Sequence, residues 1–278
     1  NGQGPDLLGL AEISTRSLLD ELAAKLPGKY LKVWEPPAKA TQTGLALLGR
    51  DNVFAQLQPV AVQRPPGLAR PRCLVVHCEL IGKLEPVLVA VNHWKSRMPA
   101  EASGQLHDAD DRRESARWLG DLLANSQPGT AAVVLGDFNA EPWEPPFNEV
   151  GLRSVRFFST ALYASATPAY LYNTAWRFMT EPDFWEEARL PHYQEPRPKT
   201  SHGKGAWLIY DQLLVSAGAL RTGPIELVEK SVQYHCQNNL TSRRTNRGAL
   251  RPLPWQTAAG GGYVGTSDHF PLLAVFKL

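Results

Sequence analysis

Ala131-Ala132-Val133-Val134-Leu135-Gly136-Asp137-Phe138-Asn139 is the strongest structural signal in this chain. Its run of apolar residues is typical of a short β-strand that is buried on both faces. Gly136 ends the run and permits close approach of a neighbouring backbone. Asp137 and Asn139 are two residues apart, so in extended geometry both side chains leave the same face at the carboxyl end, where α/β sheets bind ligands. The alternative is an Asp-Phe-Asn turn whose side chains cap their own backbone.

The residues before this stretch predict a strand-helix-strand unit. Residues 87–91 are a second apolar run, and residues 108–125 carry apolar residues at helical spacing. This order indicates an α/β layer architecture. His93, Lys95 and Arg97 follow the 87–91 strand, and three cationic or near-cationic groups in five positions suit an anionic ligand. The alternative for His93 is a structural histidine at a strand end.

The first apolar run also ends in a polar residue. Residues 7–13 predict a buried strand that carries Glu12 near its end, and a helix is expected from an N-cap at Ser14 to Pro27-Gly28. Glu12 is a candidate metal ligand. Its structural alternative is a favourable interaction with the helix N-terminus.

Two hairpins are expected between these segments. Residues 44–48 and 53–57 are predicted to pair through a turn at 49–52, and residues 73–78 to pair with 87–91. Cys73 and Cys78 are an odd number of residues apart, so they should point to opposite faces. The chain has 3 cysteines without metal-type spacing, which argues against a disulfide framework or a zinc site.

The C-terminal part adds two more candidate site residues in strands or strand ends. Residues 206–216 predict a strand that contains Asp211, and burying this carboxylate is costly unless it has a partner, for which a histidine is the natural choice. Ser267-Asp268-His269 precedes a closing strand at 272–276. Residues 141–205 are rich in proline and aromatic residues and predict a functional loop region with short helices. Its aromatic side chains could stack on a base or lipid, but a small local core is favoured.

Composition excludes several classes of protein. The chain has 278 residues, 43% of them hydrophobic, with a net charge of +2, so no global basic field marks a strong nonspecific nucleic-acid binder. The arginines of segment 243–251 are interpreted as solvated loop charge. No apolar run is long enough to span a membrane and no signal-peptide pattern is visible. The chain begins without Met, and we expect that its natural beginning is not included, which leaves the compartment open.

Five motifs together resemble the endonuclease/exonuclease/phosphatase superfamily in order and approximate separation. They are Leu10-Ala11-Glu12-Ile13, Asn92-His93, Gly136-Asp137-Phe138-Asn139, Tyr210-Asp211-Gln212 and Ser267-Asp268-His269. The resemblance covers essentially the whole chain. It implies one domain over residues 1–278 with an α/β four-layer sandwich fold, in which two mixed sheets pack face to face and helices lie outside.

The resemblance also implies a role for each motif residue. Glu12 and Asp268 would serve the metal, most simply Mg²⁺, with Mn²⁺ as a substitute. Asp137 would orient or activate the attacking water and Asn139 would bond a phosphate oxygen. His269, oriented by Asp211, would act as general base or stabilise the phosphoryl group, and His93 would touch phosphate or assist the leaving group.

The expected function is metal-dependent hydrolysis of a phosphate ester, in which a water molecule attacks. The enzyme is expected to be a monomer and to have no transmembrane segment. A nuclease-like phosphodiesterase is favoured slightly over a phosphomonoesterase acting on a sugar or lipid phosphate. A non-catalytic binding module on the same fold is the rival from another class. This chain departs from the family pattern in its long excursion after Asn139. It also lacks an early strand with an Asn upstream of Glu12, which should leave a sheet edge or part of the core exposed.

Overall fold

The structure is a computed structural model. It describes residues 4–37, 43–60, 73–97, 105–127, 129–149, 151–163, 170–180, 209–221, 223–235, 242–244, 250–252, 256–257, 263–264 and 269–278. Asp268 and residues 181–208 of the excursion lie outside these ranges, so the expectations for them are carried no further by the fold.

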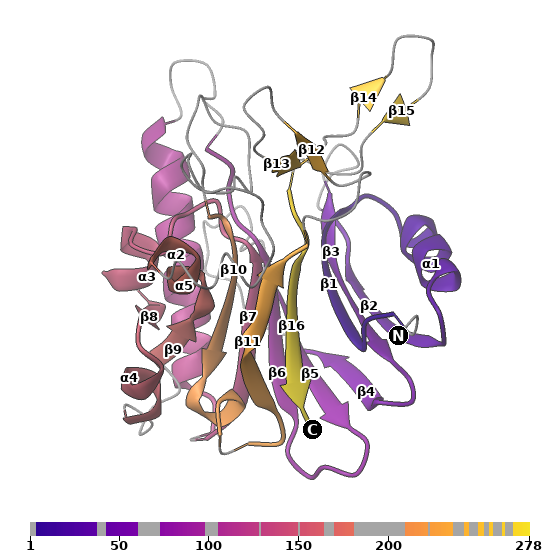
Figure 1. The fold of residues 1–278 in the computed structure, drawn as a ribbon, viewed down its shortest axis with the longest axis horizontal. Helices are drawn as coiled ribbons and strands as arrows, with labels where there is room; N and C mark the ends of the chain where they lie inside the picture. The colour runs from indigo at the N-terminus through magenta and orange to yellow at the C-terminus, as the bar shows by residue number, and fades with distance from the viewer. Residues whose placement is uncertain are drawn as a thin grey trace.

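A mixed sheet of seven strands forms the centre of the molecule (Figure 1). Its order is β4 (Phe54–Pro59), β5 (Cys73–Leu80), β6 (Val87–His93), β7 (Ala131–Asp137), β10 (Asp211–Ser216), β9 (Tyr170–Asn173) and β8 (Arg153–Val155). β6 and β7 are parallel, and helix α2 (Gln105–Ala124) joins them as the sequence predicts. The organising strand β7 lies between β6 and β10, which explains why its residues 131–134 are buried on both faces.

The second layer of strands is in two pieces. One is the sheet β1 (Leu7–Ile13), β3 (Gly44–Arg50) and β2 (Tyr30–Glu35), in the order β1-β3-β2, and the other pairs β11 (Glu226–Tyr234) with β16 (Leu272–Lys277). Among the described strands, β1 pairs only with β3 and β16 only with β11. Within the described residues, β1 and β16 thus each have one strand neighbour, and the exposed sheet edge expected from the sequence stays a prediction. Two short hairpins, β12 (Ser242–Arg244) with β13 (Leu250–Pro252) and β14 (Gln256–Thr257) with β15 (Tyr263–Val264), project from one end (Figure 1).

Three hydrophobic clusters separate four layers. The largest lies between the strand layers and includes Leu47, Val89 and Val133. A second packs α2 on the outer face of the seven-stranded sheet, and a third packs α1 (Arg16–Lys25) on the outer face of β1-β3-β2. The remaining helices are short: α3 (Pro145–Asn148), α4 (Phe158–Tyr163), η1 (Thr174–Trp176), α5 (Arg177–Thr180) and η2 (Ala217–Ala219). The architecture is the predicted four-layer α/β sandwich.

One predicted hairpin is wrong. β3 and β4 follow each other through a turn, but β3 pairs with β1 and β2 whereas β4 pairs with β5. The chain crosses from one strand layer to the other at this turn. β4 then pairs with β5 and forms the edge strand of the seven-stranded sheet. The pairing of β5 with β6 is confirmed, and Cys73 and Cys78 do lie in clusters on opposite faces.

The N-cap of α1 lies one residue after the predicted position. The N-cap is Thr15 rather than Ser14, since the Leu18 backbone amide donates to Thr15 Oγ1 at 3.2 Å. The predicted strand around Asp211 is shorter at its start, with β10 beginning at Asp211 itself. Both differences are small, and neither moves a candidate site residue to another element.

Candidate active site

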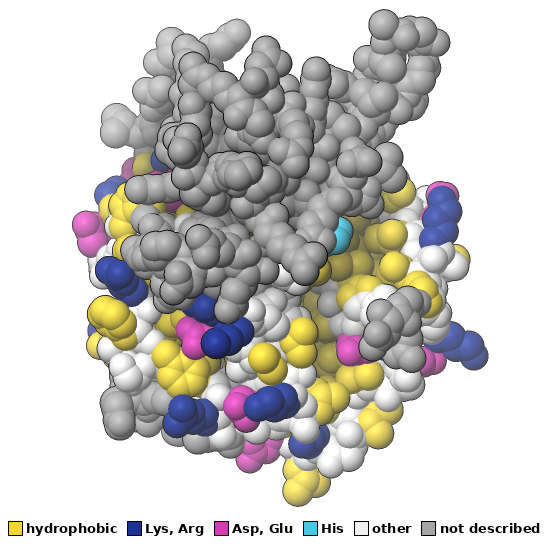
Figure 2. Space-filling model, viewed as in Figure 1, with side chains coloured by type: hydrophobic (Ala, Val, Ile, Leu, Met, Phe, Trp, Pro, Cys, Tyr) yellow, Lys and Arg dark blue, Asp and Glu magenta, His cyan; other side chains and the backbone are white. Residues whose placement is uncertain are grey.

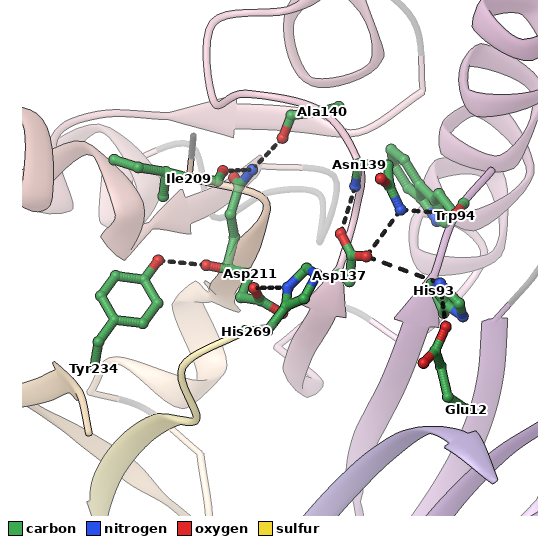
Figure 3. A network of polar contacts seen from close by, with 11 residues as sticks. Glu12, His93, Trp94, Asp137, Asn139, Ala140, Ile209, Asp211, Tyr234 and His269 are labelled. Carbon is green, nitrogen blue, oxygen red and sulfur yellow. Dashed lines mark hydrogen bonds and ion pairs between the residues drawn. The ribbon is translucent and has the colours of Figure 1, made fainter. Parts of the chain in front are cut away.

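Five of the predicted residues lie together, and three of them come from neighbouring strands of the central sheet (Figure 3). His93 ends β6, Asp137 ends β7 and Asp211 begins β10, and the register pairs His93 with Asp137 and Asp137 with Asp211. Glu12 comes from β1 in the other strand layer, and His269 lies just before β16 (Figure 3). Strand pairing within the central sheet, together with the packing of β1 and β16 on it, therefore gathers five separate motifs into one cluster.

The turn after β7 is held by its own side chains. Asp137 Oδ1 accepts from the Asn139 backbone amide at 2.8 Å and Oδ2 accepts from Asn139 Nδ2 at 2.8 Å. Asn139 Nδ2 also donates to the Trp94 carbonyl at 3.1 Å. Asn139 has a φ of 47°, a left-handed conformation that Asn tolerates better than most residues. The turn predicted as the structural alternative thus exists, and it also places Asp137 among the other candidate residues.

Asp137 is a buried carboxyl with an altered acidity. Burial raises its pKa to about 7, and the negative charges of Asp211 and Glu12 act in the same direction. The charge of His269 and the hydrogen bond from the Asn139 amide lower the pKa and only partly offset this rise. A carboxyl with a pKa near neutrality is suited to exchange a proton with a bound water.

Asp211 and His269 form a dyad. His269 Nδ1 and Asp211 Oδ2 are 2.6 Å apart. With Asp211 ionised, the carboxylate accepts a hydrogen bond from the Nδ1 proton, and Nε2 is the ring nitrogen outside the pair. The Tyr234 hydroxyl donates to the Asp211 carbonyl at 2.5 Å and so ties β11 to the start of β10. The predicted histidine partner of Asp211 is therefore found, and both side chains are less than one-quarter exposed.

Glu12 and His93 face Asp137 from the other side. His93 Nε2 is 3.8 Å from Glu12 Oε1 and 3.8 Å from Asp137 Oδ2 (Figure 3). Glu12 has a φ of 63°, and the β1–β3 register shifts between Leu10 and Ile13. Such an irregularity re-aims a side chain, and the Glu12 carboxylate is 68% exposed. It is thus available to a cation that enters from solvent.

Lys95 and Arg97 lie on the segment after His93. The Arg97 guanidinium donates from Nε to the Asn139 carbonyl at 2.8 Å, forms an ion pair with Glu144 and lies 5.2 Å from the centre of the Tyr210 ring. The Arg97 side chain therefore contacts the turn that contains Asn139 and the residues beside that turn. The Lys95 carbonyl accepts from Arg112 Nη1 at 3.0 Å, which fixes the backbone of this segment beside the site.

Sequence reasoning missed a group of buried polar residues beneath the site. Gln212, Asn173 and Glu141 are almost completely buried. Gln212 donates to the Ala140 carbonyl and Glu141 accepts from the Ile209 amide, whereas Asn173 donates to the Gln212 side chain. Gln212 stands in a motif that the sequence singled out, but only for its Asp. A glutamine inside an otherwise apolar strand is the signal that could have indicated it, because a buried amide requires several partners.

Among the described residues, Asp137, Asp211 and His269 form the one group of acidic and histidine side chains close enough to share a metal ion. One ligand atom of each lies within 4.8 Å of the others. The close Asp211–His269 hydrogen bond competes with that arrangement, because the ring proton on Nδ1 excludes a metal from this atom. Glu12 is the better metal candidate, because its side chain is exposed to solvent and its Oε1 lies 3.8 Å from His93 Nε2 rather than in a close hydrogen bond.

These features define a class of protein: an α/β sandwich with an acid-histidine site at the ends of its central strands. The chain belongs to the endonuclease/exonuclease/phosphatase family, whose model matches residues 1–269. A search of curated proteins finds no match. Within the described residues, no helix is both long and apolar enough to cross a membrane.

Solved structures with this fold are distant in sequence. A humanized D. rerio TDP2 carrying 14 mutations has a TM-score of 0.56 at 12% identity, covering 99% of this chain and 86% of its own. D. rerio TDP2 complexed with a single-strand DNA product has a TM-score of 0.53 at 10% identity, covering 99% and 86%. The Bacteroides thetaiotaomicron mannosyl-6-phosphatase has a TM-score of 0.54 at 15% identity, covering 98% and 85%. At these identities the likeness establishes the fold alone.

Proposed function

We propose that the protein is a metal-dependent phosphodiesterase that cleaves a phosphate ester by in-line attack of a water molecule. The observation that carries this proposal is the convergence of Asp137 with the Asp211–His269 dyad on one side and with His93 and Glu12 on the other (Figure 3). Phosphate-ester hydrolysis requires charge neutralisation, a positioned water and a route for a proton. The convergent residues offer each of these.

The donor set fits a divalent cation. Glu12, Asp137 and Asp211 bring three carboxyl groups together, and the charges of Glu12 and Asp211 contribute to the raised pKa of Asp137. A bound Mg²⁺ or Mn²⁺ offsets such repulsion and prefers carboxylate and water oxygens. Glu12 would hold the ion, and Asp268 would assist it, as the family resemblance implies. When bound, the cation supplies charge neutralisation to the phosphate.

The remaining residues handle the water and the phosphate. Asp137 orients the attacking water and accepts its proton, and the Asp211–His269 dyad presents His269 Nε2 to the phosphoryl group. Asn139 bonds a phosphate oxygen once a ligand competes for its amide, and His93 serves the leaving group. Lys95, and Arg97 beside the Asn139 turn, add positive charge for the anionic substrate.

The preference for a diester comes from the comparisons and from the arginine-rich segment. D. rerio TDP2 is described with a DNA product, whereas the B. thetaiotaomicron relative is described as a phosphatase acting on a sugar phosphate. The arginines in segment 243–251 favour a polyanionic substrate. A phosphomonoesterase acting on a sugar or lipid phosphate is therefore the second candidate, and a non-catalytic binding module on the same fold is the third.

The test compares bis(4-nitrophenyl) phosphate with 4-nitrophenyl phosphate, each with Mg²⁺ and with a chelator. We expect metal-dependent turnover that prefers the diester and that falls by at least ~100-fold in His269→Ala, the range that general acid–base groups contribute. His77→Ala is the matched control, because His77 is an exposed histidine on β5. A preference for the monoester would select the phosphatase. Absence of turnover in the folded protein on these and other esters would select the binding module.

A further inference from the structure

We propose that Gln212 is a positioning residue of the active site, which ties the turn after Asn139 to the segment before Asp211 from beneath. This inference rests on the proposed function for its kinetic consequence but not for its structural one. The side chain of Gln212 does not belong to the cluster of acids and histidines. Its amide nitrogen donates to the carbonyls of Ala140 and Ile209, the two residues that Figure 3 labels on either side of these bonds.

All polar positions of the Gln212 amide face a partner. Nε2 donates to the Ala140 carbonyl at 2.6 Å and to the Ile209 carbonyl at 3.0 Å, and Oε1 accepts from Asn173 Nδ2 at 2.7 Å. Two carbonyls on one side and an amide donor on the other leave a single orientation for the group. Gln212 is 0% exposed, so water cannot replace a lost bond without opening the site.

These contacts lie where the strand ladder ends. Asp137 pairs with Asp211 in the β7–β10 register, and beyond this pair the Phe138 amide donates to the Tyr210 carbonyl at 2.9 Å. Ala140 directly follows Asn139, and Ile209 lies two residues before Asp211. Glu141 adds a second tie, because its carboxylate accepts from the Ile209 amide at 3.2 Å. The segment after Asn139 and the segment before Asp211 are therefore hydrogen-bonded to each other beyond the last strand pair.

Only a glutamine can make this set of bonds in the space available. A methionine of similar length has no donor for the two carbonyls. An ionised glutamate would place a carboxylate oxygen against the two carbonyl oxygens. A protonated glutamate could donate to only one of these carbonyls. Loss of the tie should leave the fold intact and let Asp137 and Asp211 shift relative to each other. A misplacement of about 1 Å at a reacting group can cost ~100-fold in rate.

Ser216 provides a matched control at the opposite end of the same two strands. Its hydroxyl donates to the Thr130 carbonyl at 2.8 Å and accepts from the Ala132 amide at 2.8 Å, and the residue is 1% exposed. It is thus another buried polar side chain that ties β10 to the β7 segment. It differs from Gln212 in lying far along the strands from Asp137 and Asp211.

The experiment compares Gln212→Met, the milder Asn173→Ser and Ser216→Ala in the full chain. For each we would measure melting temperature, kcat and KM for bis(4-nitrophenyl) phosphate with Mg²⁺, and the NMR signal of the His269 Nδ1 proton. We expect all three to melt at a lower temperature. We expect kcat to fall by at least ~10-fold in Gln212→Met with KM nearly unchanged, less in Asn173→Ser, and not in Ser216→Ala.

The NMR signal separates this inference from the proposed function. If the wild-type protein hydrolyses no ester, the positioning role still predicts that the His269 signal shifts or broadens in the two variants around Gln212 and is unchanged in Ser216→Ala. A wild-type signal and a wild-type kcat in Asn173→Ser and Gln212→Met would overturn the inference. So would equal losses in Ser216→Ala, because these would show a general effect of lower stability. If Gln212→Met fails to fold, Asn173→Ser and Ser216→Ala still give the comparison.

Discussion

At the scale of single residues, the site contains carboxyl groups with different chemical roles. Glu12 is mostly exposed, whereas Asp137 and Asp211 are largely buried and Asp211 is bonded to His269. Exposure and partners, rather than residue type, therefore separate the candidate metal ligand from the groups that handle protons. This separation can be tested one carboxyl at a time.

Glu12→Gln and Asp211→Asn should affect different quantities, metal affinity in the first and kcat in the second. We expect Glu12→Gln to weaken Mn²⁺ binding in calorimetry by at least ~10-fold, because it removes a charged oxygen ligand. We expect Asp211→Asn to change Mn²⁺ affinity little and to lower kcat strongly, because His269 would lose its orienting partner. Glu79→Gln, on the exposed face of β5, is the control. The reverse pattern would place the ion at Asp137, Asp211 and His269 instead.

Asp137 should make the stability of the metal-free protein depend on pH. Its pKa is raised to about 7 in the folded protein, from an ordinary value of 3.8. Between these values the folded state holds a proton that the unfolded state has released, so this group lowers the free energy of unfolding as pH rises from about 4 to about 7. In chelator, the melting temperature of the wild type should fall more over this interval than that of Asp137→Asn. Parallel curves for the two proteins would contradict the raised pKa.

At the scale of elements, the sequence predicts which side chains stand at strand ends more reliably than it predicts which strands pair. Glu12, His93, Asp137 and Asp211 were found because each terminates or interrupts an apolar run, which is a local property. The β3–β4 hairpin was wrong because the choice of partner depends on β5, far along the chain. The bonds of Arg97 to the Asn139 turn and of Gln212 to Ala140 were not predictable for the same reason.

Gly136 shows a sequence signal that the structure confirms. It has a φ of 128°, and an added Cβ would lie 2.1 Å from the Asn92 carbonyl on β6. Gly136→Ala should therefore push β7 away from β6 directly beside Asp137. We expect a loss of at least about 2 kcal/mol in the free energy of unfolding, from strain and the clash together, and a large fall in kcat.

Gly129→Ala is the matched control for that change. Gly129 precedes the same strand, and its φ of 85° is also strained for a side chain, but an added Cβ would meet nothing within 4 Å. It should cost only about 1 kcal/mol in denaturant unfolding and leave kcat unchanged. Equal losses for the two variants would show that backbone conformation alone, and not the approach of β6, makes Gly136 necessary.

At the scale of the whole molecule, the two strand layers differ in continuity within the part of the chain that the structure describes. The seven-stranded sheet is continuous there, whereas the described strands of the layer opposite it form two pieces, β1-β3-β2 and β11-β16. β1 packs on β6 and β7, while β16 packs on β10, so the two pieces lie over neighbouring strands of the same sheet. β1 runs toward the site and β16 runs away from it, since Glu12 lies near the end of one and His269 before the start of the other.

The core beside these edges is only partly covered. Leu135 is half-buried although β7 is central, and the core-facing residues Leu272, Ala274 and Phe276 of β16 are half-buried as well. The face drawn in Figure 2 shows hydrophobic side chains along a hollowed band between the two pieces of this layer. Backbone amides at an edge strand lack the second partner strand that an interior strand has. These two conditions lower the free energy of local opening.

Hydrogen exchange should therefore separate the edge strands of the second layer from strands that have a neighbour on each side. We expect amides of β1 and β16 to exchange at least ~100-fold faster than those of β3 and β7, because few buried contacts and an unpaired edge favour local opening. β3 is the internal reference, since it lies in the same piece as β1 but has a neighbour on each side and is buried throughout. Mass spectrometry of peptides from these strands measures the difference. Equal protection of β1, β3 and β16 would contradict this expectation and show that the edges of β1 and β16, which have no second neighbour among the described strands, are covered in solution.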